Sequence, residues 1–294
     1  MFGKKIAYFF FRSFVGFMQI VPFWLMYRLA DGLYFLMNYV VRYRKSVIDK
    51  NLFRCFPEKT DKERKHIRKK FYKRLSDILI ESIKGYTLSE KELLKRFTSK
   101  GHEATYPNFE ENKSIFVLTG HLCNWEWGNA VISQNLKHVP AVLYKPISNP
   151  FIEKYVEARR GRFGSKMVSI YHSMRYFLVK KEKPAAYFLV ADQFPTTREK
   201  QKMVDFFGKT SAFLHGPENF SKQLKAPVYF IEMKRVKRGY YAMEFFKLAD
   251  DSSQLPENEL TQRYAAHLEA TVRRQPEDWM WSHKRWKNEL YDFE

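Results

Sequence analysis

Cysteine is scarce in this chain of 294 residues, where Cys55 and Cys123 are the only two. Two cysteines cannot build the disulfide framework that stabilises small secreted domains, which fits a chain facing a reducing compartment. A chain of this length can bury a sizeable core without such cross-links. We therefore expect one large domain, or a domain with an appendage.

Several common sequence signals are also missing. The chain has no internal repeat, no low-complexity tract, no Walker loop and no dinucleotide-binding glycine fingerprint. His215 could be grouped with His121 and Asp192 as metal ligands, but no ligand spacing supports such a site. We expect neither a metal nor a cofactor.

An apolar run of clear membrane-spanning length is absent as well. Residues 1–43 are rich in aromatic side chains, yet their longest charge-free stretch, residues 13–27, holds 15 residues, short of the roughly 20 needed to cross a hydrocarbon core. Residues 6–27 would span only if Arg12 snorkelled to the interface. Otherwise the segment would lie in the interface. We favour membrane attachment, in either mode, over the alternative of a buried first helix pair in a soluble protein.

Acidic residues are few relative to basic ones, with 32 Asp and Glu against 52 Lys and Arg and a formal charge of +20. Such a charge favours an anionic partner, either nucleic acid or an acidic membrane surface. Residues 1–100 hold 23 basic residues against 9 acidic ones. No nucleic-acid-binding signature accompanies this excess. We expect the N-terminal third to meet a membrane surface with anionic lipids, and no nucleic acid.

Residues 44–98 form a basic helical region. Thr60 and Glu63 make a capping box at the start of one helix. The Lys and Arg residues that follow would face either solvent or an anionic leaflet. We divide the chain into a membrane anchor, residues 1–43, and a catalytic domain, residues 44–294, that includes this region. The apolar face of the basic helix is marked by Ile67, Phe71, Leu75, Ile78 and Leu79.

After residue 98, short apolar runs alternate with helical stretches. This alternation predicts an α/β fold with a mixed central sheet and helices on both faces, ending in an antiparallel hairpin. The expected strands are residues 114–119, 139–144, 185–191, 228–233 and 240–246, and the expected helices lie near residues 125–134, 150–162, 173–181, 217–224 and 260–274.

The stretch FVLTGHLCNWEWGN places His121 five residues before Glu126. On a continuous helix, residues five apart point about 140° away from each other, so the two can meet only if His121 precedes the helix. Gly120 permits a turn, and Asn124 is a good N-cap that would put Glu126 in the first helical turn. Glu126 would stay ionised there and accept a hydrogen bond from one imidazole nitrogen, leaving the other nitrogen as a base.

This pair has the base and the orienting carboxylate of a catalytic triad, without a nucleophilic serine beside it. It needs an external nucleophile, and a substrate hydroxyl is the natural one; with water instead, the protein would be a hydrolase. Cys123 is disfavoured as a nucleophile, because two residues from His121 it could hardly present its sulfur to an acyl carbonyl. A non-enzymatic, membrane-tethered basic binding protein would explain the charge but not this pair.

The motif TGHLCNWEWG resembles the H-x4-D/E motif of the lysophospholipid acyltransferase superfamily, specifically the late acyltransferases of lipid A biosynthesis. The resemblance covers nearly the whole chain, because NLFRCFP, RRGRFG, VADQ, FFGKTSAF, KAPVYF and PEDWMWSHKRW follow in that family's order. Cys123 departs from the family, which often has Gly at this position. The Pro-Glu-Gly block of the glycerol-phosphate branch is absent, which argues against a glycerol-3-phosphate acceptor.

The resemblance implies an O-acyltransferase that uses acyl carrier protein or acyl-coenzyme A as donor and a lipid hydroxyl as acceptor, without a metal or an acyl-enzyme. His121 would be the general base, and Glu126 would support the imidazolium. The acceptor would be a lipid A precursor, with a lysophospholipid, an amino-acid lipid or a glycolipid as alternatives. Cations on the C-terminal side of the apolar segment place the catalytic domain on the cytoplasmic face of the bacterial inner membrane.

The resemblance also suggests substrate-binding residues. Arg160, four residues before Gly164, matches the family's R-x3-G block, and its guanidinium suits a phosphate. Arg159 or Arg162 could make this contact instead, and a solvent-exposed helix end is the alternative.

Three more positions are candidates for substrate binding. Asp192 ends an expected strand, where α/β sheets build sites, although a structural turn would also explain it. Gly208 would mark a tight backbone approach near the acyl channel. We also include Asn124. The C-terminal DWMWSHKRWKN could be interfacial or simply a packed end.

Overall fold

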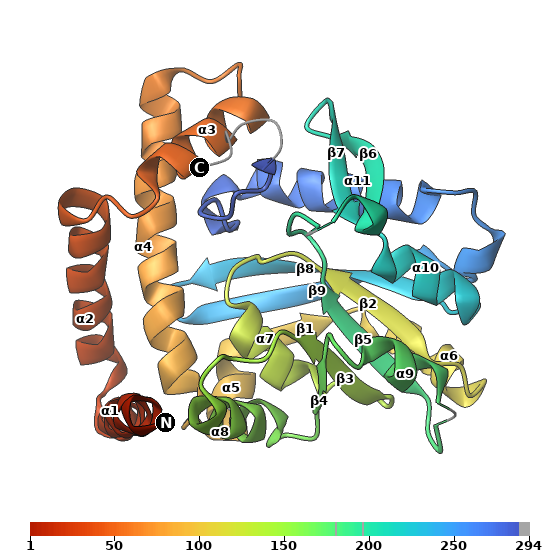
Figure 1. Cartoon of the computed structure of the whole chain (residues 1–294), viewed down its shortest axis with the longest axis horizontal. Helices are drawn as coiled ribbons and strands as arrows, with labels where there is room; N and C mark the ends of the chain where they lie inside the picture. The colour runs from red at the N-terminus through yellow and green to blue at the C-terminus, as the bar shows by residue number, and fades with distance from the viewer. Residues whose placement is uncertain (180, 196, 288–294) are drawn as a thin grey trace.

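The computed structural model describes residues 1–179, 181–195 and 197–287. A seven-stranded sheet forms the centre, in the order β1-β9-β8-β2-β5-β3-β4, with helices over both faces (Figure 1). The strands of this sheet are β1 (Phe97–Lys100), β2 (Ile115–Thr119), β3 (Val139–Tyr144), β4 (Lys166–Ser169), β5 (Ala185–Val190), β8 (Val228–Lys237) and β9 (Tyr240–Ala249).

The strands from β8 to β4 run parallel, while β9 is antiparallel to β8 and β1 is parallel to β9. In the middle, Phe116 of β2 lies opposite Tyr187 of β5 and Val228 of β8. Every residue of β2 is buried, as is typical of a central parallel strand. The chain leaves β2 towards β3 and leaves β5 in the opposite direction, towards β8. The carboxyl ends of β2 and β5 therefore form a topological switch point, where such sheets bind ligands.

Two groups of helices cover the sheet (Figure 1). One face carries α5 (Glu90–Arg96), α6 (Tyr106–Glu110), α7 (Trp125–Ile132) and α8 (Pro150–Gly161), and the other carries α9 (Ser173–Leu178), α10 (Gly216–Gln223) and α11 (Glu259–Arg274). The expected mixed sheet with helices on both faces is confirmed, and so is the β8–β9 hairpin. The sequence missed the short strands β1 and β4 at the two edges of the sheet.

A second hairpin, β6 (Gln201–Phe206) and β7 (Lys209–Leu214), packs against α11. Its turn consists of Phe207 and Gly208, which have φ angles of 55° and 68°, the left-handed geometry that two-residue hairpin turns require. A Cβ atom on Gly208 would meet no atom within 4 Å. No part of the described protein thus approaches Gly208 closely, and this glycine serves the turn. Its place near an acyl channel stays a prediction.

The N-terminal region consists of four helices: α1 (Phe2–Ile20), α2 (Phe23–Phe35), α3 (Lys45–Cys55) and α4 (Asp61–Gly85), with a π-helical turn at Leu36–Val40. The helix is interrupted between Ile20, the end of α1, and Phe23, the start of α2, so residues 6–27 do not form one straight helix. Among the described helices, none is both long enough and apolar enough to cross a membrane. Figure 1 shows α2 beside α4 and α1 beside α8.

Lys84 of α4 stabilises the junction between α1 and α2. Its Nζ atom donates to the carbonyl groups of Met18, Gln19 and Val21 over 2.7, 2.9 and 2.8 Å. A helix leaves its last carbonyl groups without partners, and a cation placed there stabilises them. At the other end of α4, Thr60 and Glu63 form the expected capping box. The first 43 residues thus pack on the rest of the chain, mainly on α4 and α8.

Candidate active site

His121 and Asp192 meet at the switch point. His121 follows β2 on the turn that precedes α7, as expected, and Asp192 follows β5. The Nδ1 atom of His121 lies 2.6 Å from Oδ1 of Asp192. The other carboxylate oxygen accepts hydrogen bonds from the backbone N–H of His121 at 2.8 Å and from Nε1 of Trp279 at 2.7 Å. Asp192 is thus held in one orientation against the imidazole.

The hydrogen bonds of the pair indicate which imidazole nitrogen faces Asp192 and which faces away from it. Burial would raise the pKa of Asp192, but the adjacent His121 and the hydrogen bonds from His121 and Trp279 lower it to about 2. An ionised Asp192 only accepts hydrogen bonds, so Nδ1 of His121 carries the proton. Nε2 of His121 lies 3.3 Å from the side-chain nitrogen of Gln193, an amide donor that suits a nitrogen with a lone pair. His121 can therefore act as a base through Nε2.

Glu126 does not orient His121, contrary to expectation. It lies in the first turn of α7, as expected, but its carboxylate faces Arg160 of α8, with Nε to Oε2 at 2.9 Å and a terminal nitrogen to Oε1 at 2.5 Å. Burial would lower the pKa of Arg160, but the charge of Glu126 and its hydrogen bond raise it. Both oxygens of the Glu126 carboxylate thus bind Arg160. The imidazole of His121 binds Asp192, which follows the neighbouring strand, instead.

Asn124, which lies between His121 and Glu126 in the chain, is fully buried. Its side-chain oxygen accepts from the backbone N–H of Trp127 at 3.0 Å, which confirms the expected N-cap of α7. Its amide nitrogen donates to Glu81 at 2.7 Å. Both groups of the side chain are therefore engaged inside the protein. A direct contact between Asn124 and a substrate, which we expected from the sequence, does not fit this position.

Cys123 adopts a φ angle of 48° beside Asn124, a conformation in which glycine is unstrained. Its Sγ atom points inward to the carbonyl oxygen of Met233 at 3.4 Å. Burial raises the pKa of the thiol well above its usual value, and a buried, protonated thiol is a poor nucleophile. The geometry thus agrees with the expectation that Cys123 is not the nucleophile.

Arg162 and Arg159 lie at the end of α8. Arg162 donates to the carbonyl groups of Gly85 and Leu88 at 2.8 and 2.9 Å, which ties α8 to the end of α4. The guanidinium of Arg159 lies 5.3 Å from the centre of the Tyr155 ring. Of the three arginines here, Arg160 is the one joined directly to a residue of the H-x4-E motif.

A narrow cleft leads to His121 between α4 and the C-terminal segment. Its free volume is about 10 Å³, and one rim is charged by Arg74, Glu277 and Asp278. Burial raises the pKa of Asp278 to about 6, although Arg74 opposes this shift. The remaining walls are mainly aromatic and aliphatic: Phe71, Leu75, Ile78, Trp125, Trp279 and Met280.

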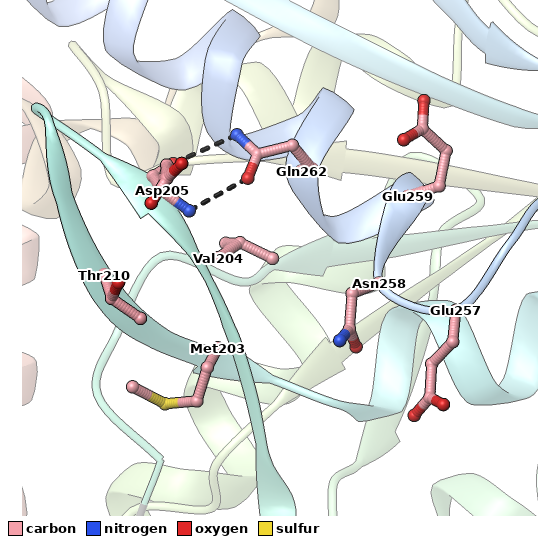
Figure 2. A pocket seen from close by; sticks show the side chains of 8 residues that line it. All are labelled: Met203, Val204, Asp205, Thr210, Glu257, Asn258, Glu259 and Gln262. Carbon is pink, nitrogen blue, oxygen red and sulfur yellow. Dashed lines mark hydrogen bonds between the residues drawn. The ribbon is translucent and has the colours of Figure 1, made fainter.

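A larger pocket, of about 280 Å³, lies between the β6–β7 hairpin and the start of α11 (Figure 2). Asp205, Glu257 and Glu259 make its lining acidic, and Gln262 bridges to the backbone of Asp205 at 2.9 and 3.1 Å. Neither His121 nor Asp192 lines this pocket. The acidic pocket is therefore separate from the His121–Asp192 pair.

The C-terminal tryptophans form a packed end rather than an interfacial one. Trp279, Trp281 and Trp286 are all buried. Trp279 pairs through its backbone with Leu122, next to His121, and its ring donates to Asp192. The sequence did not identify Trp279 as a site residue. The only sequence signal for this role was the indole N–H of Trp279, because a buried tryptophan usually donates to a polar partner.

Comparisons with known proteins agree on one family. The family model described as bacterial lipid A biosynthesis acyltransferase matches residues 4–288. A lipid A biosynthesis acyltransferase of Haemophilus influenzae is 26% identical over 270 residues, which cover 90% of this chain and 82% of that protein. A lipid A biosynthesis palmitoleoyltransferase of Escherichia coli is 23% identical over 246 residues, which cover 83% of this chain and 79% of that protein.

Proposed function

The chain belongs to the bacterial lipid A biosynthesis acyltransferase family and is an acyltransferase, and on this premise we propose that it transfers a fatty acyl chain from a thioester to a hydroxyl of a lipid A precursor. The observation that carries the proposed chemistry is the His121–Asp192 hydrogen bond of 2.6 Å at the switch point of the sheet. Because the chain belongs to an enzyme family, the alternative of a non-enzymatic binding protein is no longer needed.

In the proposed mechanism, His121 acts first as base and then as acid. Nε2 takes the proton of the acceptor hydroxyl as its oxygen attacks the thioester carbonyl. Asp192 stabilises the imidazolium that forms. The C–O bond forms, the C–S bond breaks, and the imidazolium returns the proton to the departing thiolate. The protein thus supplies no covalent nucleophile.

Arg160 is the proposed contact for an anionic group of the acceptor or donor. Glu126 engages its Nε and one terminal nitrogen, which fixes the plane of the guanidinium near the start of α7. A guanidinium held in this way is well suited to phosphate. Arg159, one position earlier, is a second candidate for the same contact. We propose that Glu126 acts on catalysis through Arg160 and the position of α7.

The acyl chain is proposed to enter along the apolar face of α4, which borders the cleft at His121. Phe71, Leu75 and Ile78 provide a wall of the right polarity. A free volume of about 10 Å³ cannot hold a fatty chain, so we propose that the walls of the cleft move apart when the donor binds. The donor is proposed to be acyl carrier protein or acyl-coenzyme A.

Membrane attachment is proposed to be interfacial, through the outer face of α1 and α2. This face exposes large apolar side chains that no other part of the described chain covers, which suits a helix that lies in the membrane interface. We propose that this membrane is the inner membrane and that the enzyme lies on its cytoplasmic face, where the flanking cations would meet anionic lipids. The most exposed of these residues on the two helices are Phe2, Phe9, Phe10, Ile20 and Trp24.

Purified enzyme in anionic vesicles provides the test. We would supply acyl carrier protein thioester or acyl-coenzyme A together with a lipid A precursor, a lysophospholipid, an amino-acid lipid or a glycolipid, and follow each acceptor by mass spectrometry. We expect the mass of one acyl chain to be added to the lipid A precursor. Acylation of another lipid alone would refute this acceptor, and thioester loss without an acylated lipid would indicate a hydrolase.

A further inference from the structure

Glu81 of α4 is a buried carboxylate that the sequence did not single out. Its side chain has no exposed surface. Oε1 accepts from the hydroxyl of Tyr27 at 2.8 Å, and Oε2 accepts from the amide of Asn124 at 2.7 Å and from the hydroxyl of Tyr241 at 2.6 Å. These partners come from α2, from the turn before α7 and from β9.

We propose that Glu81 is a positioning residue of the acyl-transfer site, which fixes Asn124 and thereby the turn between His121 and Glu126. The inference rests on the proposed function. Asn124 starts α7 through its bond to the backbone of Trp127, and its other group bonds only Glu81 in the described structure. The carbonyl oxygen of Glu81 also accepts from Nε1 of Trp127 at 2.9 Å. One residue of α4 thus holds both ends of the first turn of α7.

The chemistry of a carboxylate explains why glutamate suits this position. All three partners donate to the oxygens of Glu81 in the structure, which is the arrangement that an ionised carboxylate requires because it can only accept. Asn124 must then turn its amide nitrogen to Glu81 and its oxygen to the N–H of Trp127, which is the orientation that caps α7. A glutamine could accept or donate, and would allow Asn124 to turn over. Burial raises the pKa of Glu81, while the hydrogen bonds from Tyr241 and Tyr27 and the charge of Arg235 oppose this shift. A buried carboxylate is costly unless its oxygens are bonded in this way.

The turn that Glu81 holds lies between the two functional pairs. His121 is three residues before Asn124, and Glu126 is two residues after it. A displacement of this turn would move His121 relative to Asp192 and Glu126 relative to Arg160, because both partners come from other elements. A misplacement of about 1 Å can lower a rate by about a hundredfold.

The central variant is Glu81→Gln. We expect its kcat for acyl transfer to fall by about tenfold to a hundredfold, with the KM for the thioester changed by less than about twofold. The matched control is Asp77→Asn, which removes another buried carboxylate of α4; Asp77 binds Arg235 and Arg238 and does not touch Asn124. This control should lose stability and retain its kcat.

A swap of the two side chains separates positioning from packing. In the double variant Glu81→Gln with Asn124→Asp, the aspartate can accept from the glutamine and can still cap α7, so most of the kcat should return. Asn124→Asp alone opposes two carboxylates and should be impaired. If Glu81→Gln does not fold, Asn124→Ser keeps a capping oxygen but is too short to reach Glu81, and its kcat should fall similarly.

Hydrogen exchange of residues 120–128 gives a readout that does not depend on turnover. Glu81→Gln should speed exchange there, whereas Asp77→Asn should not. An unchanged kcat with unchanged exchange, an equal loss of kcat in Asp77→Asn, or a swap that restores nothing would overturn the inference. Wild-type enzyme that fails to transfer an acyl chain would refute the proposed function instead, and the exchange rates would still decide the role of Glu81.

Discussion

His121 and Asp192 are 71 positions apart in the chain, yet their side chains lie within 2.6 Å of each other. The sequence identified both residues and placed His121 correctly before the helix. It gave the orienting role to Glu126, because local spacing was the only geometric information available. Asp192 takes that role because β2 and β5 are neighbours in the sheet, and strand order is a property of the whole chain that no local pattern encodes.

Substitution of this pair should affect one catalytic step. His121→Ala should lower kcat by about 10²–10⁴. Asp192→Asn would favour the wrong imidazole tautomer and should lower kcat over a similar range. The double variant should be little worse than His121→Ala, since both changes remove the same base. Steady-state kinetics of the three proteins measures this.

The second pair, Glu126 and Arg160, provides a comparison for the single and double variants of His121 and Asp192. Glu126→Ala and Arg160→Ala should be non-additive with each other, because each removes the same ion pair. Glu126→Ala combined with His121→Ala should come closer to additivity. Strong coupling between Glu126 and His121 would instead restore the arrangement that the sequence suggested.

His283 gives the protein a pH-dependent stability. Burial lowers the pKa of His283 to about 4, with smaller contributions from the nearby Arg285, His121 and Arg44, while Asp192 opposes the shift. Nε2 of His283 accepts from the backbone N–H of Phe194 at 3.0 Å, a bond that requires the neutral ring. As pH falls from about 6.5 to 4, His283 binds a proton in the unfolded chain but not in the folded protein. The folded state therefore loses stability in this pH range.

His283→Gln should remove this effect, because glutamine can accept the same hydrogen bond and does not titrate. Between pH 7 and pH 5, the free energy of unfolding of the wild type should fall by about 1–2 kcal/mol more than that of the variant. Urea unfolding at both pH values measures the difference. Parallel pH profiles would show that His283 is not the responsible group.

At the level of elements, the buried strands were the most predictable part of the fold. β2, β3 and β5 are continuous apolar runs bounded by turn residues, and their hydrophobicity identifies them directly. β1 and β4 hold four residues each at the sheet edges, too few to show a periodic pattern. The β6–β7 hairpin was missed because Phe207 stands at the first turn position, where Asn, Asp or Gly is the usual signal.

Lys84 should be essential to the junction between α1 and α2. Lys84→Met would leave the buried carbonyl groups of Met18 and Val21 without this donor, and even one such group costs about 1–3 kcal/mol. We expect the free energy of unfolding to fall by at least that amount. Lys73→Met, which removes an exposed lysine of the same helix, should change it by less than about 0.5 kcal/mol. Denaturant unfolding compares the two, and equal effects would contradict the capping role.

For the whole molecule, composition predicted an anionic partner and an apolar N-terminal segment but not how that segment folds. Residues 1–43 pack on α4 through Tyr27 and Lys84, so deleting them would also remove partners of the catalytic domain. Membrane binding is better tested by changing the outer face alone, because the contacts with α4 then remain.

The triple variant Phe9→Ser, Phe10→Ser, Trp24→Ser should leave anionic vesicles at every salt concentration, because it removes apolar area from side chains that are about two-thirds exposed. Replacing four of the exposed lysines of α4 (Lys62, Lys65, Lys69 and Lys73) by Gln should weaken binding mainly at low salt, since charge attraction decays within about 8 Å at physiological ionic strength. Vesicle sedimentation across a salt series measures both. Equal salt dependence in the two variants would argue against an apolar contact.

Direct acyl transfer governed by His121 is the central claim, and a single-turnover reaction tests it most directly. Enzyme in excess over a labelled acyl thioester is mixed with a lipid A precursor in vesicles, and thioester, lipid and intact protein are followed by mass spectrometry. We predict that acylated lipid appears as fast as the thioester disappears, that the protein gains no mass, and that His121→Ala and Asp192→Asn slow both processes together. An acylated protein, or transfer at the wild-type rate by His121→Ala, would contradict this mechanism.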